Sequence, residues 1–388
     1  MNDIISNQEL LSLREQINEL DRAGLELLRQ RLSLSNQVGR LKQKINSPIT
    51  DLSREKAVIK DAQSKFEPHM SHKIESFMST TMRISRENQY EILFDLDVDW
   101  LLGSQISQAA NKIASPRQIA CQGVKGSYSH LVADRIFPGS HLIPVQTFDE
   151  TCRKVIDGEC ELAVLPLENT TAGTVNDVYD LLTTAPLYIV KAVSVPIQHK
   201  LLLLPNADIK GIRTVLSHPQ ALAQCSKFIK KMGWNQIAVE NTAFAAQQIR
   251  AEKNPTFCAI ASTEAAFING LNIADDHICD SAYNQTRFVA ISNSLIITDN
   301  AERISITFHL THQSGSLASV LNLFAERGLN LSKIQSRPVP DKPWEYSFWV
   351  DLTAKRGDRD AVLALYQLSR ELPLLKMMGW YEEIAIEG

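Results

Sequence analysis

The sequence predicts three consecutive domains of different class: all-α over residues 1–100, α/β over 117–293 and α+β over 303–383. Three observations predict this order. The first hundred residues show helical periodicity, and the middle alternates short apolar runs with helical stretches. The last segment reads β-α-β-β-α-β, the ferredoxin-like order. A chain of 388 residues is also too long for one compact core.

The composition is typical of a soluble globular protein. Hydrophobic residues make up 44%, charged residues 22%, and the formal net charge is −4, which does not favour a nucleic-acid binder. The start MNDIISNQEL lacks the features of a signal peptide, and no apolar run is long enough to span a membrane. We therefore expect a cytoplasmic protein that binds neither nucleic acid nor membrane.

The cysteines are scattered and form no CxxC pair, so we expect buried free thiols rather than a disulfide framework or a metal site. They are Cys121, Cys152, Cys160, Cys225, Cys258 and Cys279.

A strict 4,3 spacing predicts one long helix over about residues 8–46, roughly 55 Å in length. Its seam is formed by Leu13, Ile17, Leu20, Gly24, Leu27, Arg31, Leu34, Val38, Leu41 and Ile45. One such helix cannot bury its apolar stripe alone, so we expect a homodimer through these N-terminal helices. Pro48 ends the helix, Asp51 or Ser53 caps a second one, and a third covers about residues 71–100.

Arg31 is a cation on an apolar seam. The simplest interpretation is a packed stem with the guanidinium in water. Lys42, however, lies three turns further on the same face, about 16 Å along the axis. Arg14 lies about 25 Å before Arg31, and an antiparallel partner helix would bring its own Arg14 to Arg31. Buried cations are costly unless they are paired, and the carboxylates of a ligand would pair them.

The segments LREQINELD, RQRLSLSNQVGRLK, PITDLSRE and SRENQ resemble the helical chorismate mutase domain of bifunctional chorismate mutase–prephenate dehydratases. The resemblance implies that substrate carboxylates are held by Arg31, Arg54 and, from the other subunit, Arg14. It places Lys42 and Gln89 at the ether oxygen of the breaking bond and Glu55 at the substrate hydroxyl. Asp51 and Ser85 complete the pocket, although Asp51 also suits a helix cap.

The implied reaction is pericyclic and needs no nucleophile, cofactor or metal. Catalysis then consists of holding the reactive conformer and stabilising charge on the ether oxygen. Arg31, Lys42 and Gln89 are the expected catalytic residues.

The middle segment contains GVKGSYSH (residues 123–130), which lacks both phosphate-loop spacings and by itself indicates only an anion-accepting helix start. Together with PLENTTAGTVNDVYDLL, SHPQALAQCS and NQTRFVAI it resembles the prephenate dehydratase domain. That family has two α/β lobes, like a periplasmic-type binding protein, with the substrate in the cleft. The implied reaction removes CO2 and the ring hydroxyl from prephenate to give phenylpyruvate.

The resemblance implicates Thr286 in catalysis, and we expect its hydroxyl to hydrogen-bond the leaving oxygen. The expected supporting residues are Glu168, Asn169, Thr170, Ser217 and Gln224, with Arg287 as a carboxylate partner. His218 is either a titrating acid or only a residue at a helix start.

The C-terminal segment resembles an ACT domain, the amino-acid sensor of this family. Its usual GAL and ESRP motifs read GSL and QSRP here, which implies a phenylalanine site at Gly315, Ser316, Leu317, Ser336 and Arg337. Gln335 removes a charge that the family motif carries. A dimerisation module without ligand is the alternative, and Trp344 is expected in the core.

The resulting hypothesis is a bifunctional isomerase and lyase of phenylalanine biosynthesis. It acts on chorismate and prephenate and is allosterically inhibited by phenylalanine. A transcriptional regulator with a bilobed effector domain is a second interpretation, but no recognition helix is evident. A solute-binding protein is a third, and it disagrees with the missing export signal and the additional domains.

Overall fold

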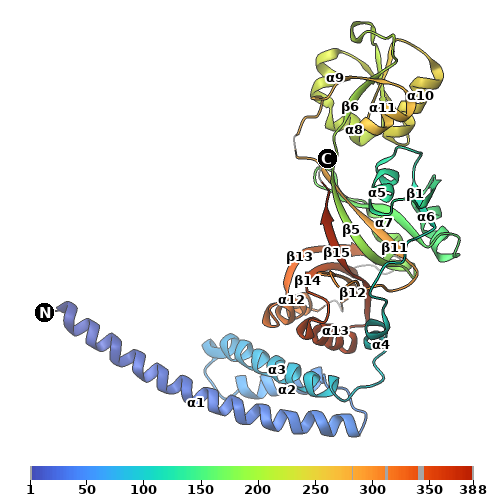
Figure 1. The fold of residues 1–388 in the computed structure, drawn as a ribbon. Helices are drawn as coiled ribbons and strands as arrows, with labels where there is room; N and C mark the ends of the chain where they lie inside the picture. Colours follow the sequence, from blue (N-terminus) through green and yellow to red (C-terminus); the bar gives the residue numbers. More distant parts are fainter. Residues whose placement is uncertain (1, 282, 311–312, 340–344, 387–388) are drawn as a thin grey trace. The chain divides into compact units, whose positions relative to one another are not determined.

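A computed structural model describes residues 2–281, 283–310, 313–339 and 345–386 (Figure 1). Trp344 lies outside these residues. The chain forms two compact units, Met1–Ser104 with Arg359–Leu372, and Gln105–Asp358 with Pro373–Gly388. Helices alone make up residues 2–108, and the order of elements beyond them is α/β and then β-α-β-β-α-β, as predicted.

The first unit begins with the long helix α1 (Asn2–Lys44). It is followed by α2 (Leu52–Gln63), a short η1 (Pro68–Met70) and α3 (Ser71–Phe94). Asp51 caps α2, since its Oδ1 accepts a hydrogen bond from the Arg54 backbone N–H at 2.9 Å. The third helix ends earlier than predicted. Asp97 accepts from the backbone N–H of Asp99 in a turn, and α4 (Leu101–Gln108) follows.

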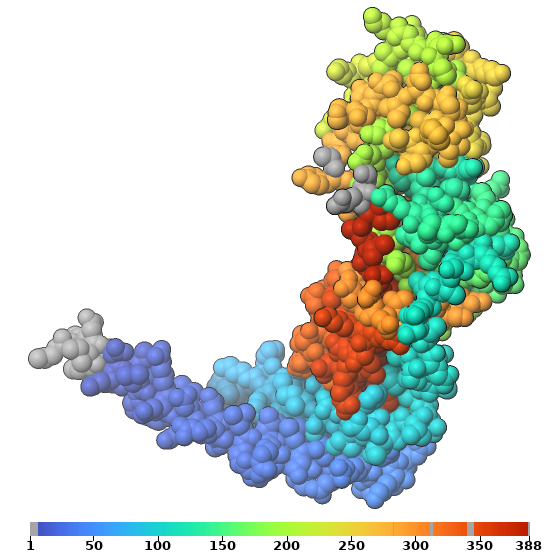
Figure 2. All heavy atoms as spheres, viewed as in Figure 1, coloured from blue at the N-terminus to red at the C-terminus, as the bar shows by residue number. Residues whose placement is uncertain are grey.

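The N-terminal part of α1 extends past α2 and α3 (Figure 1), and Figure 2 shows it in dark blue as a rod of exposed side chains. Leu20 is 72% and Leu27 66% exposed although both lie on the apolar seam. An apolar stripe of this length that is open to solvent is typical of a helix that packs against another chain.

Helix α13 (Arg359–Glu371) belongs by sequence to the third segment but packs on α3 in the first unit. The ring of Tyr366 lies edge-on to those of Phe94 and Trp100, with centroids 5.5 and 5.3 Å apart. The Trp100 indole N–H donates to Ser369 Oγ at 3.1 Å. The predicted boundary at residue 303 did not foresee this packing, because sequence order does not show which helices pack together.

The first lobe of the α/β segment and the C-terminal strands share one mixed sheet, ordered β13-β14-β12-β15-β5-β11-β3-β1-β2, with β4 beside β3. The strands of the lobe are β1 (Gln118–Gln122), β2 (His141–Val145), β3 (Leu162–Asn169), β4 (Gly173–Thr174), β5 (Tyr188–Pro196) and β11 (Gln285–Ser292). Its helices are α5 (Tyr128–Ile136), α6 (Phe148–Ile156) and α7 (Asn176–Thr184).

The second lobe has its own sheet, ordered β10-β6-β9-β7-β8. Its elements in chain order are β6 (Lys200–Leu203), η2 (Ile209–Gly211), β7 (Thr214–Ser217), α8 (Pro219–Gln224), α9 (Ser226–Met232), β8 (Asn235–Ala238), α10 (Thr242–Glu252), β9 (Phe257–Ala261), α11 (Thr263–Asn269) and β10 (Asn272–Asp275). The chain enters this lobe after β5 and returns through β11, so two segments connect the lobes.

The C-terminal segment contributes β12 (Arg303–His309), α12 (Ser316–Glu326), β13 (Asn330–Pro338), β14 (Tyr346–Thr353) and β15 (Leu374–Ala385). Strand β15 pairs antiparallel with β12 and parallel with β5, so it joins the two parts of the large sheet. At Gly379 a Cβ would lie 2.1 Å from the Ile189 carbonyl oxygen, so the junction accepts only glycine there.

All six cysteines are free thiols. Five are buried, as predicted, whereas Cys279 is half-buried. In the described part of the chain, no helix is both long and apolar enough to cross a membrane.

Candidate functional site

The first candidate site is a polar pocket formed by α1, α2 and α3. All the predicted residues of the helical segment except Arg14 line it: Arg31, Lys42, Asp51, Arg54, Glu55, Ser85 and Gln89. Arg14 lies more than four turns before Arg31 on the exposed part of α1. The protomer therefore brings together every predicted residue that was not expected from a partner chain.

Hydrogen bonds across α1 and α3 fix the side chains of this pocket. The Arg31 guanidinium donates to Thr81 O at 3.1 Å and to Ser85 Oγ. Gln89 Nε2 donates to Ser35 O at 2.9 Å, and Gly39 leaves room for this, since a Cβ there would lie 3.0 Å from Gln89 Cγ. The amide is thus held rigidly against α1.

Lys42 Nζ donates to the carbonyl of Ile49 at 2.7 Å, so it closes the turn that carries Asp51. Burial lowers the pKa of Arg31, because the pocket disfavours a charge without a counterion. A bound anion would supply that counterion.

Sequence reasoning missed Ser35, Ile49, Met82 and Arg86, which also line the pocket. Ser35 lies four residues after Arg31 and thus on the same helix face, a signal that was available. Arg86 follows Ser85 directly, and only the packing of α3 shows that it reaches the pocket. Its guanidinium Nη1 lies 2.5 Å from Glu55 Oε1.

The pocket holds four cationic side chains, Arg31, Lys42, Arg54 and Arg86, against the two carboxylates Asp51 and Glu55. This excess of positive charge suits a small dianion. Among the described residues that line the pocket there is no cysteine or histidine. The arrangement can therefore bind, orient and polarise a ligand, and it offers no strong nucleophile.

The second candidate site is the cleft between the two α/β lobes. Its polar lining consists of Gln122, Ser127, Tyr128, Ser129, Asn169, His199, His218, Gln220, Gln224, Asn241, Thr242 and Thr286. No Asp, Glu, Lys or Arg is among the described residues that line it. The cleft therefore offers a ligand neutral donors and acceptors.

Thr286 and Asn169 are neighbours on β11 and β3 in this cleft. Asn169 Nδ2 lies 2.9 Å from Thr286 Oγ1 and 2.8 Å from Asn284 Oδ1. Asn169 Oδ1 accepts from the backbone N–H groups of Thr171 and Ala172 at 3.0 and 2.9 Å. Because the amide donates to Thr286 Oγ1, the threonine proton is free to point into the cleft.

Gln224 connects elements from both lobes. Its Oε1 lies 2.9 Å from His199 Nε2 and accepts from Asn284 Nδ2 at 3.1 Å, and its Nε2 donates to Thr171 Oγ1 at 2.5 Å. The His199 contact requires the Nε2–H tautomer, which leaves Nδ1 as an acceptor. That Nδ1 is buried and has no hydrogen-bond partner among the residues that the structure describes.

Burial lowers the pKa of both His199 and His218 below the ordinary value, so each imidazole is neutral near pH 7. His199 is only 3% exposed. His218 Nδ1 accepts from the Gln220 backbone N–H at 3.2 Å and so caps α8. Sequence reasoning considered His218 and missed His199, which lies between β5 and β6, directly before β6.

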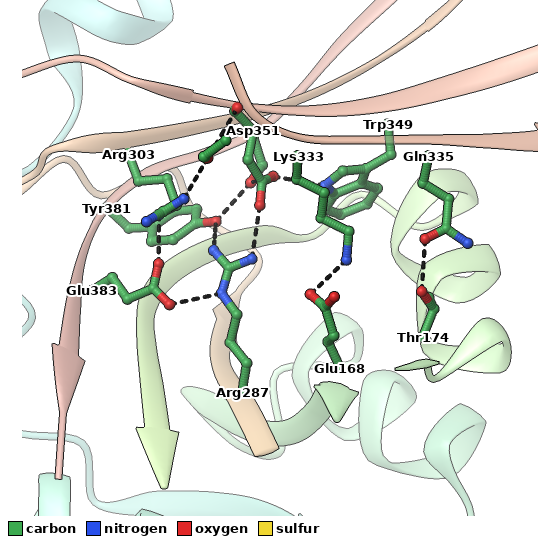
Figure 3. Close-up of polar contacts among 12 residues, drawn as sticks. Glu168, Thr174, Arg287, Arg303, Lys333, Gln335, Trp349, Asp351, Tyr381 and Glu383 are labelled. Atoms are coloured by element: carbon green, nitrogen blue, oxygen red, sulfur yellow. Dashed lines mark hydrogen bonds and ion pairs between the residues drawn. The ribbon is translucent and has the colours of Figure 1, made fainter. Parts of the chain in front are cut away.

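Glu168 and Arg287 are not among the residues that line the cleft, contrary to the expectation for both. Figure 3 shows them directed instead towards Lys333 and towards Asp351 and Glu383. Thr286 pairs with Asn169 and Arg287 with Glu168 in the register of β11 and β3. Side chains alternate along a strand, so one pair faces the cleft and the other faces the opposite side of the sheet.

The Arg287 guanidinium is instead the centre of a buried network with the C-terminal strands. It lies 2.7 Å from Asp351 Oδ2, 3.0 Å from Glu383 Oε1 and 2.9 Å from Tyr381 Oη (Figure 3). The charge of Arg287 is thus already paired, and the prediction that it binds a substrate carboxylate does not agree with this geometry.

Thr170 and Ser217 also make structural hydrogen bonds outside the cleft. The Thr170 hydroxyl accepts from the Gln285 backbone N–H at 3.0 Å. Ser217 is fully buried and donates to Ile260 O at 2.6 Å. Both fix the strands that carry cleft residues.

The residues predicted to bind phenylalanine lie on two elements. Gly315 precedes α12 in a left-handed conformation (φ 84°), with Ser316 and Leu317 in the first turn. Ser336 is exposed on β13, the strand at the end of the large sheet. Arg337, on the same strand, pairs with Asp180 of α7, Nη2 to Oδ2 at 2.5 Å, so its charge is not available to a ligand in this arrangement.

Alternate residues of β13 contact the lobe that carries the cleft. Lys333 Nζ lies 2.6 Å from Glu168 Oε2, and Gln335 Oε1 accepts from Thr174 Oγ1 at 2.6 Å (Figure 3). With Arg337 they form one face of the strand. The glutamine that replaces the glutamate of the family motif is therefore a contact with the segment next to Asn169.

Comparison with known proteins agrees with this division. Family models match the chain in order: Chorismate mutase type II over residues 13–90, Prephenate dehydratase over 119–295 and ACT domain over 304–370. The bifunctional chorismate mutase/prephenate dehydratase of Escherichia coli (strain K12) is 31% identical over 389 residues, which is 97% of each chain.

Other relatives match about 70% of this chain. The arogenate dehydratase/prephenate dehydratase 2 of Arabidopsis thaliana is 37% identical over 72% of this chain and 76% of its own length. The prephenate dehydratase from Arthrobacter aurescens, solved in complex with L-Phe, has a TM-score of 0.63 at 27% identity, over 68% of this chain and 90% of that one. The identity to the E. coli protein along nearly the whole of both chains shows that this chain belongs to the family of bifunctional chorismate mutase/prephenate dehydratases.

Proposed function

We propose that the two pockets are the two active sites of a bifunctional enzyme. The helical pocket converts chorismate to prephenate, and the cleft converts prephenate to phenylpyruvate, CO2 and water. The observation that carries this proposal is the clustering of Arg31, Lys42, Arg54 and Gln89 in one pocket. Two assays on the purified protein test it: disappearance of chorismate, and formation of phenylpyruvate from prephenate.

In the helical pocket, the cations hold the substrate dianion in the conformer that rearranges. Arg31 and Arg54 bind carboxylates, and Lys42 and Gln89 donate to the ether oxygen, where negative charge develops as the C–O bond breaks. Donors that are already oriented cost no reorganisation at that moment. Glu55 accepts from the substrate hydroxyl, and Asp51 orients the turn as the α2 cap.

In the cleft, the ring carboxylate leaves as CO2 and its electron pair moves into the ring, while the ring C–O bond breaks and the hydroxyl departs with a proton as water. The Thr286 hydroxyl, oriented by Asn169, donates to the departing oxygen. A neutral cleft favours the step, because a strong cation at the ring carboxylate would stabilise the ground state and oppose decarboxylation.

Dehydratase activity is expected to fall on the acid side with an apparent pKa below 6.5. Burial lowers the pKa of His199, so this imidazole stays neutral as pH falls to 6.5 and gains a proton only below that. The contribution of His199 to folding stability has the same sign. It is fully present above pH 6.5 and is lost as pH falls through the pKa of His199 in the folded state. The measurement is kcat/KM for prephenate against pH.

The matched variant is His199→Gln, whose amide can still donate to Gln224 but does not titrate. It is expected to lose the acid limb, which is the fall of kcat/KM at low pH. His218→Gln is expected to keep it. Mutase activity in the same samples is an internal control, since no histidine is among the described residues lining that pocket. An unchanged acid limb in His199→Gln would contradict the assignment.

The mutase site is completed by Arg14 of a second subunit in a homodimer formed through α1. The exposed seam of α1 and the position of Arg14, too far from Arg31 for one ligand, support this arrangement. Arg14→Ala and Arg31→Ala are each expected to be inactive as mutases. Their random mixture after subunit exchange is expected to recover about a quarter of the wild-type activity, because half the dimers then have one intact site.

The complementation experiment has a clear negative outcome. If Arg14→Ala alone keeps its mutase activity, or the mixture stays inactive while mixed dimers form, the composite site is excluded. Sedimentation of each variant separates these results from simple loss of the dimer.

Phenylalanine inhibits the dehydratase by binding to the ACT segment near Gly315 and Ser336. The row Lys333, Gln335 and Arg337 contacts Glu168, Thr174 and Asp180, which flank Asn169 in sequence, so movement of β13 would reach the cleft. The bound L-Phe of the Arthrobacter aurescens enzyme supports the choice of effector. Phenylpyruvate formation with and without phenylalanine tests it.

A further inference from the structure

Arg86 of α3 lies between two carboxylates from different elements. Its Nη1 is 2.5 Å from Oε1 of Glu55 on α2, and its Nε is 3.6 Å from Oε1 of Glu371 on α13. The Arg86 side chain is only 17% exposed. A single, largely buried guanidinium is thus shared by an acid in the mutase pocket and an acid in the C-terminal third of the sequence.

The position of Glu371 is fixed by the packing of α13 on α3. Tyr366 packs against Phe94 and Trp100, and its hydroxyl donates to Asp97 Oδ2 at 2.8 Å. Gln367 Nε2 donates to Glu371 Oε1 at 3.2 Å. Both ends of the link are therefore held by defined contacts.

The charged and titratable groups around this link come from every element that forms the pocket. They are Arg31 and Lys42 from α1, Asp51 and Arg54 beside Glu55, Arg86, Glu87 and Tyr90 from α3, and Glu371 from α13. Burial raises the pKa of Glu371, which Arg86 counteracts. Without Arg86, Glu55 and Glu371 would repel each other in a site of limited solvent access.

We propose that Arg86 is a positioning residue of the mutase site, which orients Glu55 towards the substrate and is itself held by Glu371 of α13. The proposal rests on the proposed role of Glu55 in that pocket. It follows that α13, from the C-terminal third of the sequence, contributes to how strongly Arg86 binds Glu55.

The relation between the three side chains is a competition. When the Glu371 carboxylate attracts Arg86 from the Nε side, Arg86 holds Glu55 less strongly, and Glu55 keeps an oxygen available for the substrate hydroxyl. Removal of the Glu371 charge leaves Glu55 as the sole carboxylate of Arg86, and removal of Arg86 leaves two carboxylates facing each other. The two changes therefore have opposite effects on protonation of the site.

The test measures kcat and KM for chorismate against pH in the full-length protein. Arg86→Leu is expected to lower kcat/KM about ten-fold or more at neutral pH, mainly through KM, and to shift the acid limb up by roughly one pH unit. Glu371→Gln is expected to shift that limb down. In the double variant the upward shift is expected to be smaller, because the repulsion from Glu371 is gone while the loss of the Arg86 charge remains.

Two further variants and one control assay make the result specific. Arg86→Lys keeps the charge and is expected to hold the acid limb near its wild-type position. Arg359→Gln removes another ion pair between α13 and α3, with Asp95 at 2.9 Å, that does not reach the pocket, and it is expected to leave the pH profile unchanged. Dehydratase activity in every sample reports folding of the rest of the chain.

The outcomes separate the inference from the function on which it rests. A wild-type kcat/KM and pH profile in Arg86→Leu would overturn the inference. So would a lower activity in Arg86→Leu with an unshifted acid limb, if Glu371→Gln also leaves the limb unshifted. If Arg86→Leu does not fold, Glu371→Gln still decides, since an unchanged limb contradicts the competition. Retained mutase activity in Arg31→Ala would instead overturn the proposed site itself.

Discussion

Replacement of Arg31 by alanine is expected to lower mutase kcat/KM by roughly 10²- to 10³-fold and to leave dehydratase activity unchanged. Arg31 is half-buried, donates to Thr81 O and Ser85 Oγ, and lines the pocket that we propose binds the substrate carboxylate. Loss of one partner of a buried, hydrogen-bonded charge pair costs about 2–5 kcal/mol. Chorismate consumption at saturating and limiting substrate measures the effect.

The matched control is Arg29→Ala, two residues earlier on α1. Arg29 is exposed and pairs with Glu26 at 2.7 Å, a surface interaction of little energetic value. It is expected to retain mutase activity within about two-fold. Equal losses in both variants would indicate an effect on the helix rather than on the pocket.

Replacement of Thr286 by alanine is expected to have the opposite selectivity, with dehydratase kcat reduced about 10²- to 10³-fold and mutase activity unchanged. The magnitude is that of removing one hydrogen-bond donor to an oxygen that gains negative charge. The substitution also leaves Asn169 Nδ2 with one partner fewer in the buried cluster. Phenylpyruvate formation from prephenate is the measurement.

Thr286→Ser keeps the hydroxyl and is expected to recover most of the lost rate. Thr184→Ala provides a control, because Thr184 is exposed at the end of α7 and bonds only the Asp180 and Leu181 carbonyls among the described residues. If Thr286→Ala loses both activities, or Thr286→Ser stays as slow as alanine, the hydroxyl does not have the proposed role.

The order of the domains and most of the helical pocket could be predicted from the sequence. The 4,3 spacing of α1 places Arg31 and Lys42 on one face, and Pro48 and Asp51 determine where the next helix begins. These features depend on helix geometry and capping, which are local. The pairing of Asn169 with Thr286 joins residues far apart in sequence, and only the resemblance to a known family brought them into one prediction.

Other features needed the tertiary structure. Thr286 and Arg287 are adjacent in sequence, yet the sheet separates them, one facing the cleft and the other the buried network with Asp351 and Glu383. The motif alone does not show which side of a strand faces the ligand, because both sides are covered by protein. His199 was missed for a similar reason, since the burial of its side chain depends on elements that are distant in sequence.

The sequence by itself thus determined the three segments, the long exposed seam of α1 and the residue types of both sites. The tertiary structure decided that Glu168 and Arg287 serve the junction with β13, β14 and β15, and that Arg86 meets Glu371 of α13. The physical reason is the distance along the chain over which each signal acts. Helical periodicity and caps depend on residues within a few turns of one another. Burial of a charge depends on which distant element supplies its counterion, and packing alone fixes that.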